Sequence, residues 1–230
     1  MGVRCMDTYK RLTLVCGHYG TGKTNVAVNL ALALRAQGLP MAMADLDIVN
    51  PYFRTKDSAA RLEQAGIRLI CSAFANSNVD IPSLPPDLYA ITDDRNTHMV
   101  LDIGGDDSGA TVLGRLAPVI REENDYAMLL VVNGYRPLTR DAASTMEVLR
   151  DIEAASGLRF TGIVNNSNLG VETTAADVLH SVDYAEQVAQ TSGLPVVLTT
   201  VDERLYPALE GKIPQLFPLR LQDNRIFLNE

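Results

Sequence analysis

The residues from Gly17 to Thr24 read Gly-His-Tyr-Gly-Thr-Gly-Lys-Thr and fit the pattern G-x-x-x-x-G-K-[ST]. This spacing is typical of a loop that cradles the phosphates of a nucleotide. Its glycines let the backbone bend with N–H groups pointing inward, which makes a nest for an anion. Lys23, expected as a surface charge that takes part in catalysis, would reach the β- and γ-phosphates, and the Thr24 hydroxyl would hold Mg2+. The candidate nucleotide-binding residues in this stretch are Gly17, Tyr19, Gly20, Thr21, Gly22, Lys23, Thr24 and Asn25.

Such a loop needs a strand before it and a helix after it. The apolar run at 11–16 predicts a buried strand, and the residues 25–37 predict a helix. The start of that helix would add the positive end of its dipole to the anion nest. A plain glycine turn is the alternative interpretation, but pattern and context agree on a nucleoside triphosphate, and we expect ATP.

Asp102 ends a second apolar run at 98–101, and Gly105 follows three residues later. Ligands of a parallel sheet bind at the carboxyl ends of its strands, so residues there are candidates for chemistry. We expect Asp102 to orient Mg2+, often through water. The N–H of Gly105 could contact a γ-phosphate, and losing that contact on hydrolysis would make a conformational switch. A strand followed by a glycine turn is the alternative.

Asp45 and Asp47 follow the strand predicted at 41–44. Two carboxylates this close repel each other unless a cation lies between them, and bound Mg2+ with ATP supplies one. We expect Asp45 to help hold a metal-bound water. We expect Asp47 to act in catalysis by orienting the water that attacks the γ-phosphate, because this chemistry depends on positioning and charge. A solvated acidic turn is the alternative.

In this order and spacing, the loop at 17–24, the acids at 45–47 and Asp102 with Gly105 resemble the MinD/ParA branch of P-loop NTPases, which includes the CobQ/CbiA amidoligases. The resemblance spans residues 11–218. It implies that the acid matching Asp47 positions the hydrolytic water and that the acid matching Asp102 supports Mg2+.

The resemblance also implies that an asparagine at the end of a later strand reads the adenine amino group. Asn165 or Asn166 falls where that asparagine would be. An amide suits this role because it can both donate and accept hydrogen bonds. A capping asparagine in a turn is the alternative.

The loop departs from most members of this family near its start. They begin G-K-G-G, and their first lysine crosses a dimer interface to the partner's nucleotide, whereas this chain has His18 and Tyr19 there. A neutral imidazole is a poor substitute for a fixed ammonium. A homodimer therefore stays open as a partner state, with Arg54, Arg115 or Arg136 as candidates for the missing charge. Without such a cation we expect slow hydrolysis.

Short apolar strands alternate with helical segments along the chain. This pattern predicts an α/β fold of the P-loop NTPase kind, with helices on both faces of a mostly parallel central sheet, in a single nucleotide-binding domain over 1–230. The stretch 76–86 is predicted as a loop, either a lid or partner contact or a passive insertion. The expected strands are 11–16, 41–44, 66–71, 98–102, 126–132, 160–164 and 194–198, and the expected helices are 25–37, 58–64, 110–121, 139–155 and 184–190.

Composition limits the classes of partner. The net charge of −8 and the pI near 4.9 disfavour nucleic acid and anionic lipid, which need clustered lysines and arginines. Cys5, Cys16 and Cys71 are odd in number and form no C-x-x-C pair, so we expect free thiols and no iron–sulfur cluster. No run is apolar enough for a signal peptide or a membrane span, so we expect a soluble, cytoplasmic protein that acts on no membrane.

These expectations favour a Mg2+-dependent ATPase that acts as a nucleotide-driven switch on an unidentified protein client, with 47–54 and 104–109 as its switch segments. The alternative is an ATP-dependent small-molecule ligase or kinase of the CobQ/dethiobiotin synthetase type, in which ATP phosphorylates a substrate carboxylate. A nucleotide sensor without hydrolysis is a third hypothesis, and Asp47 argues against it.

Overall fold

The computed structural model describes residues 10–46, 56–71, 94–105 and 107–221, and the strands in these ranges form one sheet. The sheet has eight strands in the order β3-β2-β4-β1-β5-β6-β7-β8. Each neighbouring pair is parallel. The predicted α/β architecture with a parallel central sheet is therefore confirmed.

The order of the helices and strands is close to the one expected from the sequence. In chain order they are β1 (Leu12–Cys16), α1 (Lys23–Arg35), β2 (Met41–Leu46), α3 (Lys56–Gln64), β3 (Arg68–Cys71), β4 (His98–Ile103), α5 (Asp107–Glu123), β5 (Tyr126–Val132), the 3-10 turn η3 (Pro137–Thr139), α6 (Ala142–Ser156), β6 (Gly162–Asn165), the 3-10 turn η4 (Gly170–Glu172), α7 (Ala175–Ser192), β7 (Val196–Asp202), α8 (Tyr206–Leu209) and β8 (Leu216–Leu219).

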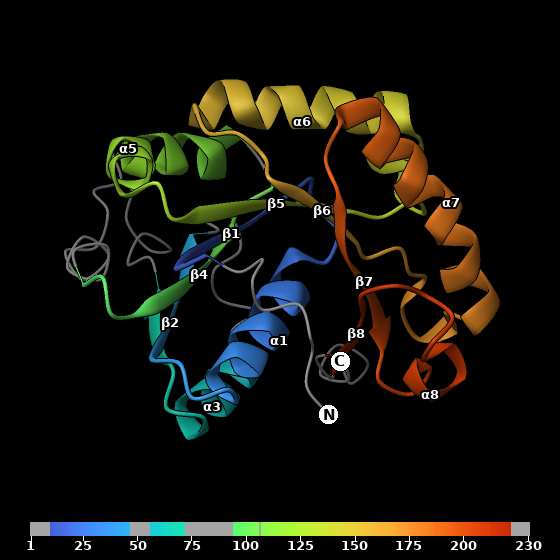
Figure 1. Ribbon diagram of the computed structural model, residues 1–230, viewed down its shortest axis with the longest axis horizontal. Coiled ribbons are helices and arrows are strands. Elements are labelled where there is room, and N and C mark those ends of the chain that lie inside the picture. The colour runs from blue at the N-terminus through green and yellow to red at the C-terminus, as the bar shows by residue number, and fades with distance from the viewer. Residues whose placement is uncertain (1–9, 47–55, 72–93, 106, 222–230) are drawn as a thin grey trace, which may run out of the picture.

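Helices cover both faces of the sheet (Figure 1). On one face, Leu14 and Leu130 belong to a core that includes residues of α5, α6 and α7. On the other face, Val15 and Val100 belong to a core with α1 and α3. Strands buried on both faces read as continuous apolar runs, which is why β1 and β5 could be predicted from composition alone.

Two parts of the fold differ from the expected elements. The helix predicted at 184–190 is the end of α7, which begins at Ala175 behind a capping box between Thr174 and Asp177. The short helix α8 and the strand β8 were not predicted. The strand β8 contains Pro218, which cannot donate to a ladder, and the end of the strand order is where a sheet tolerates proline.

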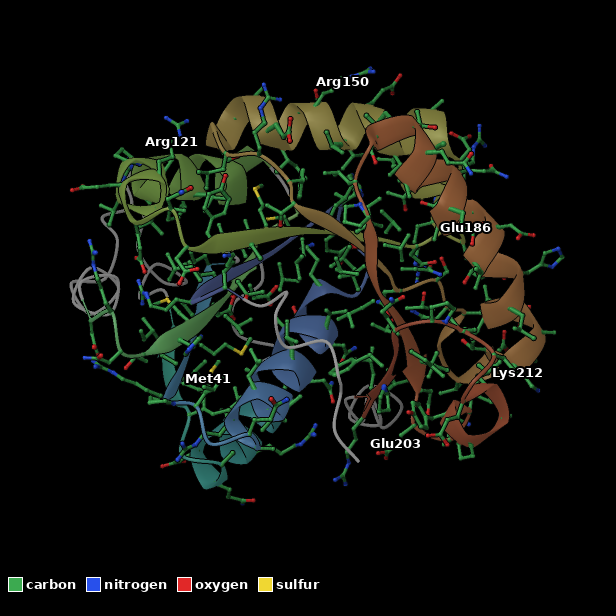
Figure 2. The ribbon with its side chains drawn as sticks, in the orientation of Figure 1. Met41, Arg121, Arg150, Glu186, Glu203 and Lys212 are labelled. Atoms are coloured by element: carbon green, nitrogen blue, oxygen red, sulfur yellow. The ribbon has the colours of Figure 1, made fainter. Side chains whose placement is uncertain are left out.

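The topology brings the candidate residues to one edge. Because every pair is parallel, the loops after β1, β4, β5, β6 and β7 all leave the sheet at its carboxyl edge, and β1 lies in the middle between β4 and β5. Charged side chains such as Arg150 and Glu186 point away from the sheet into solvent (Figure 2). Among the described helices, none has the length and apolar character that crossing a membrane requires.

A buried ion pair ties the opposite, amino edge of the sheet. The Arg11 guanidinium pairs with the Glu123 carboxylate, and both side chains are largely buried, at 4% and 7% exposure. The same guanidinium donates to the backbone oxygens of Asp94 at 3.1 Å and Thr97 at 2.8 Å. This side chain thus joins the start of β1, the end of α5 and the turn before β4.

Removing one partner of this pair is expected to cost more than removing both. Arg11→Met leaves a buried carboxylate without its cation, which typically costs about 3–5 kcal/mol, whereas a double apolar replacement is often close to neutral. Urea unfolding of Arg11→Met and of Arg11→Met with Glu123→Leu measures the difference. Lys10→Met is the matched control, since Lys10 and Asp125 form an exposed pair at 3.6 Å that should contribute less than about 1 kcal/mol. Equal losses in the single and double variants would contradict the prediction.

Candidate functional site

One carbonyl oxygen holds the loop between β1 and α1 in shape. The His18 oxygen accepts hydrogen bonds from the Thr21 N–H at 3.3 Å, the Thr21 hydroxyl at 2.8 Å and the Nζ of Lys23 at 3.2 Å. Thr21 and Lys23 are 0% and 4% exposed. The expectation that Lys23 is a surface charge was therefore wrong, because its ammonium lies inside the loop.

Two loop glycines are required by close neighbours. A Cβ added at Gly17 would lie 2.5 Å from the Val131 oxygen at the end of β5. A Cβ added at Gly22 would lie 2.3 Å from Nδ2 of Asn166, and the φ of +88° at Gly22 is itself in the left-handed region. The loop is therefore wedged between the ends of β5 and β6.

The helix α1 begins without the side-chain caps that α6 and α7 have. Gly22 is its N-cap and supplies no side-chain hydrogen bond, and no acidic residue lies in its first turn. By contrast, Asp141 caps α6 and Thr174 caps α7. The first N–H groups of a helix need acceptors, so an uncapped start beside a glycine loop suits a phosphate.

The carboxylates of Asp45 and Asp102 lie side by side on the sheet. They are register partners on β2 and β4, so their side chains leave the same face, and both are buried. Val100, two residues before Asp102, packs in the core with α1, which identifies this face as the one that α1 covers. The two acids therefore lie near the start of α1, where Thr24 is also buried.

Gly105 lies directly against the loop. A Cβ added there would come 2.6 Å from the Tyr19 nitrogen and 2.7 Å from Nζ of Lys23. A few residues on, a Cβ at Gly109 in the first turn of α5 would meet the Gly104 oxygen at 2.5 Å. The segment after β4 is thus packed between the phosphate loop and the start of α5.

Asn166 braces the loop from the other side. Its Nδ2 donates to the Thr21 oxygen at 2.6 Å, and its Oδ1 accepts from the Thr200 hydroxyl at 2.5 Å. The side chain therefore connects the phosphate loop to the ends of β6 and β7. This is a role that the sequence did not suggest.

Asn165 has a different set of partners. It is completely buried, and its Nδ2 donates to the Ser181 hydroxyl at 2.9 Å while its Oδ1 accepts from the Ser167 N–H at 3.2 Å. Both candidate amides thus have protein partners. The adenine-reading role expected of one of them stays a prediction.

The buried thiol of Cys16 lies at the end of β1, directly before the loop. Burial raises the pKa of this thiol far above its ordinary value, the ammonium of Lys23 partly opposes the rise, and the carboxylate of Asp102 adds to it. The cation and the anion both act on the last residue of β1. Lys23 and Asp102 thus both lie within electrostatic reach of Cys16.

The donor set fits Mg2+ better than a transition metal. Thr24, Asp45 and Asp102 offer oxygen atoms, and Mg2+ is usually held by one or two carboxylates together with phosphate oxygens and water. The described residues contain no group of three or more His, Cys, Asp or Glu side chains that could hold a metal ion by itself. In addition, the buried Oδ1 of Asn25 has no hydrogen-bond partner among the described residues, so an unused acceptor lies next to Thr24.

The structure brings most of the candidate residues together at the carboxyl edge. They are Gly17, Tyr19, Gly20, Thr21, Gly22, Lys23, Thr24, Asn25, Asp45, Asp102, Gly105 and Asn166. Asp47, the rest of the segment 47–54 and the predicted loop 76–86 lie outside the described residues. Thr200, whose hydroxyl donates to Asn166, was missed, although it lies in β7 shortly after the apolar run Val196-Val197-Leu198.

The brace at Asn166 should matter for binding as well as for stability. Asn166→Ala leaves the Thr21 oxygen and the Thr200 hydroxyl without this partner, which should cost about 1–3 kcal/mol of stability and weaken binding of Mg2+ with ADP about tenfold. Thermal unfolding and calorimetric titration measure the two effects. Asn168→Ala is the control, because Asn168 bonds the backbone of Asn166 and Gly170 but not the phosphate loop. Equal affinities in the two variants would rule out the brace.

Comparisons with known proteins agree with this geometry. The solved structure of cell division protein FtsY from Thermotoga maritima superposes with a TM-score of 0.55 at 18% identity, over 84% of this chain and 62% of that one. The signal recognition particle receptor FtsY from Elizabethkingia anophelis gives 0.52 at 18%, over 86% and 60%. A nucleotide-binding protein from Archaeoglobus fulgidus, solved with ADP, gives 0.50 at 13%, over 92% of both chains.

At these identities the likeness shows the fold alone, and this chain spans about three fifths of the length of the FtsY chains. No curated protein matches the sequence. Residues 12–205 match the family model described as the CobQ/CobB/MinD/ParA nucleotide binding domain. That stretch contains the phosphate loop, both buried acids and the brace. The chain therefore belongs to the CobQ/CobB/MinD/ParA family of P-loop nucleotide-binding proteins.

Proposed function

We propose that this protein is a cytoplasmic Mg2+-dependent ATPase whose nucleotide state sets the conformation of the segment after β4 and, through it, the binding of a protein partner. The family and fold support nucleotide binding and a relation to nucleotide hydrolases in general. The choice of ATP, the role of Mg2+ and the partner are the parts that we propose.

The contact between Gly105 and Lys23 is the observation that carries the switch. Lys23 donates to the His18 oxygen at 3.2 Å, and a Cβ at Gly105 would meet the same Nζ at 2.7 Å. When a phosphate binds, the Lys23 ammonium has to divide its hydrogen bonds between the His18 oxygen and the phosphate oxygens. Any shift of Lys23 therefore acts directly on Gly105, and from there on Gly104 and the start of α5.

The candidate residues would supply the parts that phosphoryl transfer needs. The loop N–H groups and Lys23 hold the phosphates, and Thr24, Asp45 and Asp102 would hold Mg2+. When bound, Mg2+ neutralises charge on the phosphate oxygens. Asp47 is proposed from the sequence to orient the attacking water, so that positioning and charge together lower the barrier.

Exposed apolar side chains around the site favour a protein partner over a small-molecule substrate. Tyr19 is 57% exposed, Leu138 52% and Val171 80%. These residues follow the ends of β1, β5 and β6, and so do the exposed Tyr135 and Leu169. Large apolar side chains gathered on loops of one edge are typical of a surface that another protein covers.

The choice of ATP rests on the family resemblance and not on the neighbours' ligands. The Archaeoglobus fulgidus protein was solved with ADP, whereas one FtsY structure from Elizabethkingia anophelis was solved with GDP. Titration of this protein with ATP and with GTP, each with Mg2+, tests the choice directly. Tighter binding of GTP would replace ATP in the proposal without changing the rest.

The purified protein should hydrolyse ATP in the presence of Mg2+ without any added small molecule, and phosphate release over time measures this. Lys23→Ala should lose nucleotide binding. Asp47→Asn should keep binding and lose turnover, because it removes transition-state positioning more than ground-state contacts. Asp102→Asn should raise the Mg2+ concentration needed for half-maximal turnover. Phosphate release that begins only when a carboxylate substrate is added would favour the ligase alternative.

Gly105→Ala should uncouple nucleotide binding from the conformational change. The new Cβ would push against the Tyr19 nitrogen and Nζ of Lys23, so the segment can no longer follow the ammonium. Hydrogen exchange at the start of α5 should differ between ADP and a non-hydrolysable ATP analogue in the wild type and should not differ in the variant. Gly114→Ala, whose Cβ would lie 3.1 Å from the Ala155 oxygen, controls for a methyl group added away from the loop, within α5. A nucleotide-dependent difference that survives in Gly105→Ala would refute the switch.

A further inference from the structure

A second cationic side chain lies against the phosphate loop. A Cβ added at Gly20 would lie 4.0 Å from both Cδ and Nε of Arg136, and these are the nearest atoms of another residue at that position. Arg136 follows β5 in the chain and reaches the loop from outside, whereas Lys23 reaches it from within. Two cations thus lie against the same loop, Lys23 buried within it and Arg136 exposed beside it.

The backbone that carries Arg136 is fixed. Its N–H donates to the Asn133 oxygen at 3.0 Å, and its own oxygen accepts from the Thr139 N–H at 3.1 Å. The same Asn133 oxygen accepts from the Thr139 hydroxyl at 2.8 Å. Pro137 restricts Arg136 to an extended conformation, with φ −109° and ψ 138°. The first bonds of the Arg136 side chain therefore point in a set direction. Ordering the rest of the side chain costs little further conformational entropy.

The guanidinium itself is exposed. In the ranges that the structure describes, no hydrogen bond or ion pair involves the Arg136 side chain. A long cation that is anchored at its base and unengaged at its tip, beside an anion nest, is suited to bind an anion. Its planar fork can donate two hydrogen bonds to neighbouring phosphate oxygens.

Arg115, the other described candidate for the missing charge of the loop, is less well placed than Arg136. Arg54 lies outside the described residues. Arg115 lies in the middle of α5, away from the start of that helix where Gly105 meets the loop. The second position of the loop holds His18, whose Nδ1 lies 3.1 Å from the Tyr19 oxygen.

We propose that Arg136 is a catalytic residue of this site, which places its guanidinium on γ-phosphate oxygens of bound ATP within the same molecule. This proposal rests on the proposed ATPase function. The oxygen of the attacking water forms a bond to the γ-phosphorus, and the bond from that phosphorus to the bridging oxygen breaks with its electron pair left on ADP. The water's proton passes to phosphate or solvent. Arg136 neither gains nor loses a proton and acts by stabilising the negative charge of the transferring group.

The loss of Arg136 should appear in turnover and not in nucleotide affinity. Arg136→Ala should lower kcat on the order of tenfold or more, while KM for ATP with Mg2+ changes by less than about threefold. Arg136→Lys should recover part of the rate, since an ammonium keeps the charge but not the fork. Arg140→Ala is the matched control, because Arg140 is 74% exposed in the same segment and pairs with Asp141 at 3.4 Å. It should behave as the wild type.

A measurement without turnover separates this proposal from the proposed function. The wild type should bind ADP with Mg2+ and aluminium fluoride more tightly than ADP with Mg2+ alone, and calorimetry should show that Arg136→Ala loses this gain. If the wild type shows neither the gain nor hydrolysis, the ATPase function falls and this proposal falls with it. If the wild type shows both and Arg136→Ala matches Arg140→Ala in both, the ATPase function stands and only the role of Arg136 is overturned.

Mixing two variants tests whether Arg136 acts within its own molecule. Lys23→Ala cannot bind nucleotide but keeps Arg136, and Arg136→Ala binds nucleotide but lacks the guanidinium. The mixture should be no more active than Arg136→Ala alone, and the wild-type rate per molecule should not depend on protein concentration. Recovery of activity on mixing would show that the arginine reaches a partner's nucleotide and would overturn the assignment within one molecule.

Discussion

The shape of the phosphate loop depends on neighbouring backbone and side-chain groups that leave no room for a side chain at Gly17, Gly22 or Gly105. The end of β5 lies under Gly17, Asn166 after β6 lies beside Gly22, and Gly105 after β4 lies against Tyr19 and Lys23. Each neighbour is itself held by the parallel sheet, so the loop inherits its shape from the register of three strands. An interior at crystal-like packing density transmits such contacts with little slack.

The carboxyl and amino edges of the sheet therefore have different roles. At the carboxyl edge, polar and charged groups are buried beside the loop, where Lys23, Asp45 and Asp102 lie among apolar strands. At the amino edge, the buried pair of Arg11 and Glu123 ties β1 to α5. Burying a charged side chain without a partner costs free energy. The charged side chains at both edges therefore need their partners to stay in place. The edge with the loop carries the candidate nucleotide site, and the ion pair at the other edge contributes stability.

Much of this arrangement could be predicted from the sequence because its signals are local. The loop motif, the apolar central strands and Asp102 with Gly105 each read from a few neighbouring residues. The burial of Lys23 could not be predicted in this way, because it depends on how the loop folds onto its own His18 oxygen. The brace at Asn166 and the position of Arg136 depend on contacts between segments that are far apart in the chain.

The secondary structure that was missed has equally specific reasons. The first half of α7 has a narrow apolar face of small side chains, Ala175, Val178 and Val182, and its capping box at Thr174 and Asp177 was the clearer signal. The strand β8 contains a proline and is short, which are features of a strand at the end of a sheet. Both elements take much of their stability from tertiary packing around Val201 and Leu209, which composition along the chain does not reveal.

Cys16 gives this protein an internal reporter of loop motion. It ends β1 directly before the loop, is 1% exposed, and has a thiol whose pKa burial raises far above its ordinary value. Alkylating reagents attack the thiolate, so a buried and protonated thiol is silent until the strand end opens to solvent. The rate at which Cys16 is alkylated in the native protein would then measure the free energy of that local opening. The alkylation rate of one sulfur atom would thus report how often the loop region opens, although the loop at 17–24 itself contains no cysteine.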